Sequence, residues 1–186
     1  MASDEALSNG LRAHNPEAFE WLVNRFEGQL FRYFYCEHRN HHRAEEQVAE
    51  TLLEFTRSVH AMQGTFDQLA GFIFGIARHV RMRHWRYQRA NKTIAQDRVE
   101  IELLVDSRSS AASLMEAREQ IEQILGLIGQ FHEQVRDVLL FRFVEGYSLQ
   151  QISDMLDMPL GSVKSHIHRG INKLRELLSH TDCLHE

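Results

Sequence analysis

The sequence is poor in residues that interrupt helices or cross-link a chain. Its 186 residues include only 2 prolines, 10 glycines and 2 cysteines. So few helix-breaking residues predict long, uninterrupted helices. Two cysteines are too few for a disulfide scaffold, which favours a reducing, cytoplasmic setting. No apolar run approaches membrane-spanning length, so we expect no membrane insertion.

Motifs of common catalytic chemistry are also missing. The sequence has no Gly-rich phosphate loop, no nucleophile elbow and no zinc-protease motif. We therefore expect neither an enzyme nor a bound cofactor. Hydrophobic residues make up 43% of the chain, which is enough to bury the cores of one or two small domains.

Acidic residues are absent from two stretches, although the net charge of the chain is −5. Neither Arg78–Lys92 nor Pro159–Arg175 contains an aspartate or glutamate, and both are rich in arginine, lysine and histidine. Because local charge decides where a phosphate backbone can bind, the negative total does not exclude nucleic acid.

The second of these stretches lies in a predicted helix-turn-helix. Ser148 is a good N-cap for a short helix, with Gln151 placed to complete a capping box, and Pro159 can begin the next helix. One buried stripe is predicted from Val163, Ile167, Ile171, Leu174 and Leu178. The opposite face carries Ser162, Lys164, Ser165, His166, Arg169 and Lys173. This pattern is typical of a major-groove DNA reader, and the alternative is a helical hairpin with a solvated basic face.

The N-terminal half predicts further helices. A helix begins at Pro16 and carries an aromatic stripe, which we interpret as core. Ala44–His60 is the next helix, with Leu53 expected to face inward. Its outer edge is acidic and contains Glu45, Glu46, Glu50 and Glu54. Such an edge is either solvated or a docking surface for a basic partner.

A loop carrying Phe66 precedes a helix that changes character along its length. The helix begins apolar and becomes basic, with Trp85 and Tyr87 among arginines. Arginines that follow a backbone and rings that stack on bases suit single-stranded or melted nucleic acid. Alternatively, the rings pack inward and the arginines extend along the surface. Phe72 and Phe74 cannot share one helix face, so at least one should be exposed or at an interface.

A polar segment separates two halves of the chain. Apolar periodicity disappears at 93–117, and two further helices are predicted, Arg118–Gly129 and His132–Val144, with Ile124 and Phe143 on their apolar faces. We predict an all-α protein of two small helical domains, 1–92 and 118–186, joined by a flexible linker at 93–117.

Two groups of cysteine and histidine raise the question of metal. They are Cys36, His38, His41 and His42, and near the end of the chain His180, Cys183 and His185. Neither group has the paired CxxC spacing of a zinc site. We interpret them as polar segments of a histidine-rich chain and predict no metal site.

Three stretches resemble the conserved regions of extracytoplasmic-function (ECF) sigma factors, minimal members of the sigma-70 family of bacterial RNA polymerase. RAEEQVAETLLEF (Arg43–Phe55) is similar to the family's DAEDLVQE-type helix, which binds the polymerase. FIFGIARHVRMRHWR (Phe72–Arg86) is similar to its promoter −10 helix, often written WLYGIARN. Val138–Leu177 is similar to its −35 reader, where PxGTVKSR is usual. The three stretches follow the family's order and, with the linker, span nearly the whole chain.

The resemblance implies a sigma factor that binds the β and β′ subunits of core RNA polymerase and directs promoter-specific transcription initiation. It implies that Glu45, Glu46 and Glu50 face the polymerase. It implies that the residues that bind the −10 element are Phe66, Phe72, Arg78, His79, Arg83, Trp85 and Arg86. The basic face of the second helix of the helix-turn-helix would read the −35 element. Many relatives are held inactive by an anti-sigma factor, which is therefore a possible partner.

The sequence departs from the family pattern at several positions. Gln47 replaces a leucine, His166 stands where arginine is common, and Gly170 replaces an alanine. The rival interpretation is a stand-alone helix-turn-helix regulator with an N-terminal sensor or dimerisation module, binding duplex DNA as a dimer. Such a module has no reason to carry the aromatic and basic segment Phe72–Lys92.

Overall fold

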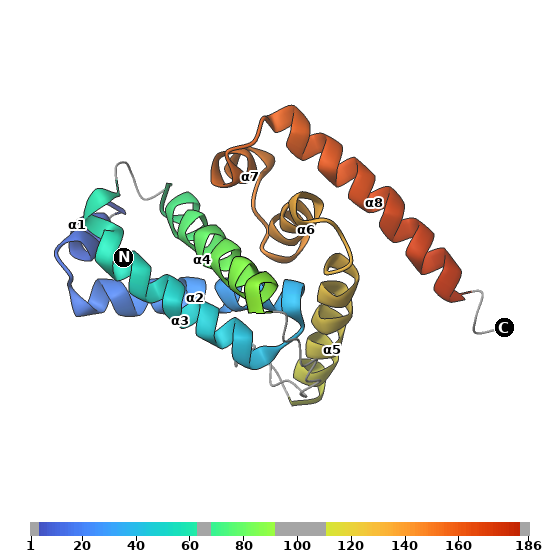
Figure 1. Cartoon of the computed structure of the whole chain (residues 1–186), viewed down its shortest axis with the longest axis horizontal. Coiled ribbons are helices and arrows are strands. Elements are labelled where there is room, and N and C mark those ends of the chain that lie inside the picture. Colours follow the sequence, from blue (N-terminus) through green and yellow to red (C-terminus); the bar gives the residue numbers. More distant parts are fainter. Residues whose placement is uncertain (1–3, 63–67, 92–110, 183–186) are drawn as a thin grey trace. The chain divides into compact units, whose positions relative to one another are not determined.

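The computed structural model describes residues 4–62, 68–91 and 111–182, and all the regular elements in these ranges are helices (Figure 1). The chain divides into two compact units, Met1–Glu102 and Leu103–Glu186, and each is described by itself. The all-α fold predicted from the sequence is confirmed. None of the helices in the described ranges is long and apolar enough to cross a membrane.

The described residues of the first unit form four α-helices. They are α1 (Asp4–Arg12), α2 (Pro16–His38), α3 (His41–Ser58) and α4 (Leu69–Asn91), with a short 3₁₀ turn η1 (Val59–Ala61) after α3. The α2–α3 connection is tight because both ends are capped: Arg39 ends α2 in the left-handed conformation (φ 51°), and the Asn40 side chain accepts a hydrogen bond from Arg43 N. This turn brings α3 back along α2.

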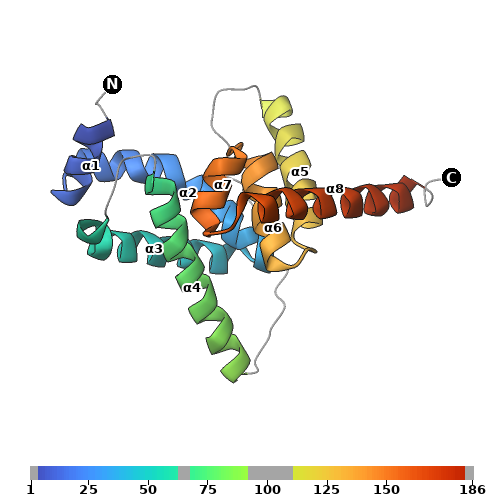
Figure 2. The same ribbon diagram turned by 90° about the horizontal axis from the view of Figure 1, so that it is seen from above.

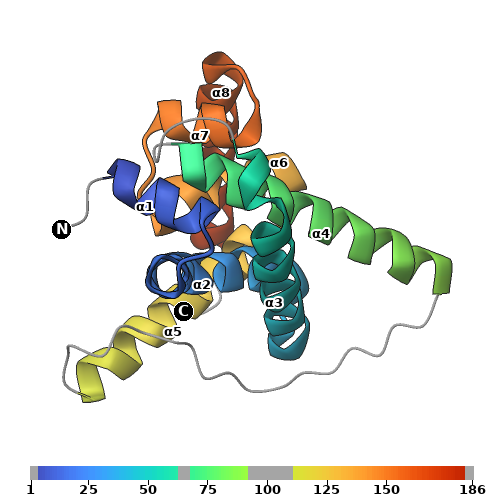
Figure 3. The ribbon, with the colours of Figure 1, turned by 90° about the vertical axis from the view of Figure 1, so that its left-hand side faces the viewer.

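An aromatic core joins α2, α3 and α4. Phe74 of α4 is buried, with its ring centroid 6.4 Å from that of Phe26 and 5.6 Å from that of Tyr33. Phe72 is half-buried and packs edge-on against Phe55 of α3. The two rings therefore take different sides of α4, as helical geometry requires. Figures 2 and 3 show the C-terminal half of α4 extending beyond α2 and α3.

One inward residue predicted for α3 is wrong. Leu53 is 51% exposed. The buried residues of α3 follow helical spacing and are Ala44, Gln47, Val48, Thr51 and Phe55. Thr51 is tolerated there because its hydroxyl donates to Gln47 O at 2.7 Å.

The second unit contains the remaining helices. They are α5 (Ala111–Ile128), α6 (Glu133–Leu139), the π-helical turn η3 (Leu140–Val144), α7 (Leu149–Leu156) and α8 (Leu160–Asp182). Helix α5 begins seven residues before the start predicted at Arg118, so the last part of the expected linker is helical. Residues 93–110 of that linker lie outside the described part of the chain.

Two apolar residues predicted to face the core of this unit are exposed. Phe143 is 53% exposed because the π-helical turn adds a residue to the helical repeat after Leu139 and changes which side chains face inward. Leu140 and Phe141 are buried in its place. Ile124 is 43% exposed because Leu125, about 100° further round the helix, takes the inward position.

Candidate nucleic-acid interface

The predicted helix-turn-helix is present. Ser148 Oγ accepts a hydrogen bond from Gln151 N at 3.2 Å, and Gln151 Oε1 accepts from Ser148 N at 2.9 Å, which completes the capping box at the start of α7. Asp157 ends α7 in the left-handed conformation. Ser153 Oγ donates to Met158 O at 2.6 Å across the turn, and α8 begins directly after Pro159.

The inward face of α8 differs from the predicted stripe. Among the side chains of α8 that the structure describes, which end at Leu177, the buried positions at helical spacing are Val163, His166 and Gly170; Leu178 of the predicted stripe lies outside them. Ile167 and Ile171 are only half-buried. The face that packs in the domain is therefore rotated from the one that apolar residues alone indicate, and a histidine lies in the middle of it.

His166 was expected on the outer, DNA-facing side, and that placement is wrong because the side chain is only 9% exposed. Arg169 Nη2 donates a hydrogen bond to His166 Nδ1 at 3.1 Å, so the proton of the neutral ring is on Nε2. Burial lowers the pKa of His166 below its ordinary value, and the nearby charges of Arg169 and His132 lower it further. His166 is therefore neutral at neutral pH.

The outer face of α8 has four neighbouring polar side chains. Lys164, Ser165, His168 and Arg169 line an open depression. His168 was missed in the sequence, although it lies four residues after Lys164 and so falls on the same helix face. The remaining predicted residues contribute less to this depression: Ser162 is half-buried, and exposed Lys173 pairs with Glu176 at 3.0 Å.

The basic half of α4 presents rings and cations to solvent. Trp85 is 44% exposed and Tyr87 is 70% exposed, which favours the surface interpretation of these rings over inward packing. The guanidinium of Arg89 lies over the Trp85 ring, 4.6 Å from its centroid. His79 and Arg86 are also exposed.

Other basic or aromatic residues of this region are less available. Arg81 is buried, with its guanidinium over the Tyr33 ring and 3.6 Å from Glu37. Arg78 is half-buried, as is Phe72 in its contact with Phe55. Phe66 lies outside the described residues.

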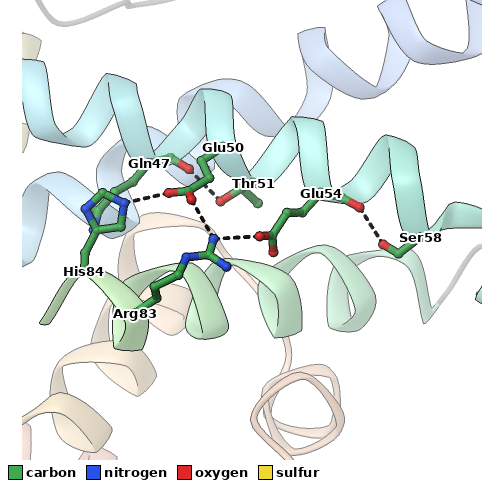
Figure 4. A network of polar contacts seen from close by, with 7 residues as sticks. All are labelled: Gln47, Glu50, Thr51, Glu54, Ser58, Arg83 and His84. Atoms are coloured by element: carbon green, nitrogen blue, oxygen red, sulfur yellow. Dashed lines mark hydrogen bonds and ion pairs between the residues drawn. The ribbon is translucent and has the colours of Figure 1, made fainter. Parts of the chain in front are cut away.

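The acidic edge of α3 divides into two parts. Glu45 and Glu46 are exposed, and each lies 3.3 Å from a histidine one turn earlier in the helix. Glu50 and Glu54 instead point toward α4, where each places an oxygen 2.6 Å from Arg83 Nη2 (Figure 4). The sequence did not predict this second group as a contact between helices.

A histidine completes the contact between α3 and α4. His84 Nε2 lies 2.6 Å from the other carboxylate oxygen of Glu50, so Glu50 bridges two consecutive residues of α4 (Figure 4). The hydrogen bond to Glu54 is the largest contribution that raises the pKa of Arg83. Arg83, predicted as a DNA contact, is thus paired with acids in the free chain.

The cysteine and histidine residues near the α2–α3 turn have other contacts. Cys36 is buried. The ring centroid of His41 lies 4.9 Å from that of Phe31. Within the described ranges, no three histidine, cysteine, aspartate or glutamate side chains are placed to hold a metal ion. The side chain of His180, and residues Cys183 and His185, lie outside the described part.

Comparison with known proteins agrees with this architecture. Residues 121–174, which include α7 and α8 as far as Leu174, match the family model of sigma-70 region 4. The ECF RNA polymerase sigma factor SigX of Bacillus subtilis is 24% identical over 175 residues, covering 91% of this chain and 87% of the relative. SigE of Mycolicibacterium smegmatis, also an ECF RNA polymerase sigma factor, is 25% identical over 170 residues, covering 87% of this chain and 62% of that relative.

The fold has a solved counterpart. The structure of CnrH in complex with the cytosolic domain of CnrY aligns with a TM-score of 0.69 at 19% identity, covering 96% of this chain and 99% of the other. The region 4 match and the two relatives, which cover most of this chain, together with the all-helical two-unit fold, support a transcription initiation factor. The similarity is to the sigma-70 family of RNA polymerase sigma factors, and within it to the ECF group.

Proposed function

We propose that this sigma factor binds core RNA polymerase through α3, contacts the promoter −10 element through α4 and reads the −35 element through α8. The observation that carries the proposal is the presence of separate basic surfaces on the two units, one with exposed rings and one on a helix-turn-helix. In this assignment residues 1–92 act on the −10 element, 118–186 act on the −35 element, and 93–117 connect them.

The −35 contact is assigned to the outer face of α8. Lys164, Ser165 and Arg169 offer positive charge and donors around one depression, which suits a phosphate backbone at the edge of the major groove. We add His168 to this set and remove His166 as a direct contact, because its ring is buried.

The −10 contact is assigned to the exposed half of α4. Single-stranded DNA presents unstacked bases and a flexible backbone, and exposed rings with nearby arginines match both. Trp85, Tyr87, Arg86 and His79 are the exposed residues that suit this role. Opening a promoter needs no hydrolysis by this chain, because contacts with the separated strand offset unstacking costs of roughly a few kcal/mol.

The polymerase contact is assigned to the outward acids of α3. Glu45 and Glu46 are exposed and form a negative surface for a basic partner on the β′ or β subunit. A factor that works with polymerase would act in the cytoplasm. Since CnrH was solved with the cytosolic domain of CnrY, a protein that sequesters this chain is a further proposed partner.

The decisive experiment is run-off transcription with core polymerase on genomic promoter fragments. We expect discrete transcripts only when this chain is added. These transcripts should disappear when either promoter element is changed. Failure to direct initiation at any promoter would overturn the proposal, and binding to a palindromic duplex without polymerase would favour a stand-alone regulator.

The polymerase surface has its own test. Glu45→Lys with Glu46→Lys should weaken core binding at least tenfold without changing the melting temperature, because both side chains are exposed. The matched control is Glu20→Lys with Glu27→Lys, which makes the same charge change at exposed positions of α2. Equal losses in both variants would mean that total charge, and not this surface, governs binding.

A further inference from the structure

The contact between α3 and α4 lies next to the surface proposed for polymerase, because Glu50 is one turn after Glu46, and it holds Arg83 of the helix proposed for DNA. Arg83 Nη2 has carboxylate oxygens of both Glu50 and Glu54 at 2.6 Å, and Glu50 also bonds His84 (Figure 4). The side chains are between 30% and 51% exposed. The network is therefore at the surface, where another charged group can reach it.

Arg83 cannot form strong ion pairs with two carboxylates and a phosphate at the same time. Its two short contacts place Nη2 between the carboxylates, and an approaching phosphate would be repelled by both of them. The positive charge of Arg83 is thus largely compensated in the free chain. A cation that bound Glu50 would compete with Arg83 for that carboxylate. It would also release His84 from its hydrogen bond with Glu50.

From this geometry we propose that Glu50 and Glu54 act as positioning residues, which hold Arg83 and His84 against α3 until a basic group of core polymerase binds Glu50. Polymerase binding then makes these two α4 side chains available to the −10 strand. The inference rests on the proposed function, since it uses both of its surfaces. It goes further by assigning Glu54 a role and by naming the side chains through which the two binding events would be coupled.

The first test measures affinity of the free full-length chain for a fluorescent −10 single-stranded oligonucleotide. Glu54→Gln removes an acceptor of Arg83 outside the proposed polymerase surface, and we expect binding to tighten about three- to tenfold with a salt slope steeper by roughly 0.7, the value for one additional phosphate contact on a single strand. Glu46→Gln is the matched control, because it removes an equal charge from α3 at an exposed position beside His42.

The source of the gain is identified by a second substitution. In an Arg83→Ala background, Glu54→Gln should give no more gain than Glu46→Gln does. If Glu54→Gln and Glu46→Gln tighten binding equally, or if the gain persists without Arg83, the proposed positioning is wrong. If the contact between Glu54 and Arg83 only stabilised the packing of α3 against α4, Glu54→Gln would lower the melting temperature without steepening the salt slope.

The second test uses the reciprocity of coupled binding. If Arg83 competes with a polymerase cation for Glu50, Arg83→Ala should bind core polymerase about three- to tenfold more tightly while opening promoters less well. Arg86→Ala, an exposed arginine on the same helix, controls for the general loss of positive charge. The coupling would be overturned if Arg83→Ala bound polymerase no more tightly than Arg86→Ala. If the wild-type chain itself did not direct transcription, the proposed function would fail instead.

Discussion

Gly170 of α8 packs directly against Leu139 of α6. A β-carbon at Gly170 would lie 2.7 Å from Leu139 Cδ2 and 2.8 Å from Cδ1. Leu139 is fully buried, so its side chain has little space into which to move. The absence of a side chain at position 170 therefore sets how closely α8 approaches the rest of its unit.

Gly170→Ala tests this close approach. Alanine favours a helix by about 1 kcal/mol over glycine, but overpacking a core costs about 1–3 kcal/mol, so we expect net destabilisation of about 1 kcal/mol. In a Leu139→Ala background the clash is gone, and Gly170→Ala should then stabilise by about 1 kcal/mol. Urea unfolding of the four proteins measures the cycle, and additive effects would mean that the two residues are not in steric conflict.

Gln47 is the second core position that departs from the family pattern. It is 1% exposed, and neither amide atom has a hydrogen-bond partner in the part of the chain that the structure describes. A buried amide without partners costs about 1–3 kcal/mol. Gln47→Leu should therefore raise the unfolding free energy by about that amount in urea titrations. The contrast is Thr51→Val, one turn along, which removes a hydroxyl that is hydrogen-bonded; a gain there as large as at Gln47 would contradict the explanation.

Elements governed by local sequence were predictable, and those governed by packing between helices were not. The start of α7 follows from Ser148 and Gln151, which lie within one turn and cap each other. His166 lies at the right spacing for either face, and only packing against the rest of the unit decides that it is buried. Phe143 could not be placed, because the spacing of apolar residues does not indicate the π-helical turn that exposes it.

Among the charged residues of the candidate site, exposure was predictable from local sequence, but contacts between helices were not. Glu45 and Glu46 were predicted as outward acids, and they are exposed. Glu50 belongs to the same sequence pattern, but its contact with Arg83 spans 33 residues and depends on how α4 crosses α3. No local rule places that arginine beside two acids, so its pairing appears only in the folded chain.

Stability should depend on pH through His166. Its pKa is lowered by burial and by the charges of Arg169 and His132. Below about pH 6.5, the unfolded chain therefore takes up a proton that the folded chain binds less readily. The contribution of neutral His166 to the unfolding free energy is complete above pH 6.5. It is lost as the pH falls from there toward the pKa of His166 in the folded chain. Thermal unfolding between pH 8 and 5 should be less pH-dependent in His166→Gln than in the wild type, and identical profiles would contradict this assignment.

Backbone contacts and base contacts on α8 should respond differently to substitution. Lys164 is exposed beside the depression, and a lysine on the DNA backbone acts as a point charge. Lys164→Ala should weaken holoenzyme binding about equally on all −35 variants and lower the salt slope by roughly one unit. Lys173→Ala is the control, because Lys173 already pairs with Glu176 and should change the slope less.

His168 should behave in the opposite way. Asn172 Nδ2 lies 3.4 Å from His168 Nδ1, so Nδ1 accepts from the amide and Nε2–H remains to donate to a base such as guanine, through O6 or N7. His168→Ala should cost about 1 kcal/mol at one −35 base pair and leave the salt slope unchanged. Holoenzyme binding to single-base −35 variants at several salt concentrations measures both effects. Uniform losses of the same size for Lys164→Ala and His168→Ala on every promoter would refute the division of roles, since a phosphate contact cannot distinguish base pairs and a single base contact cannot affect them all alike.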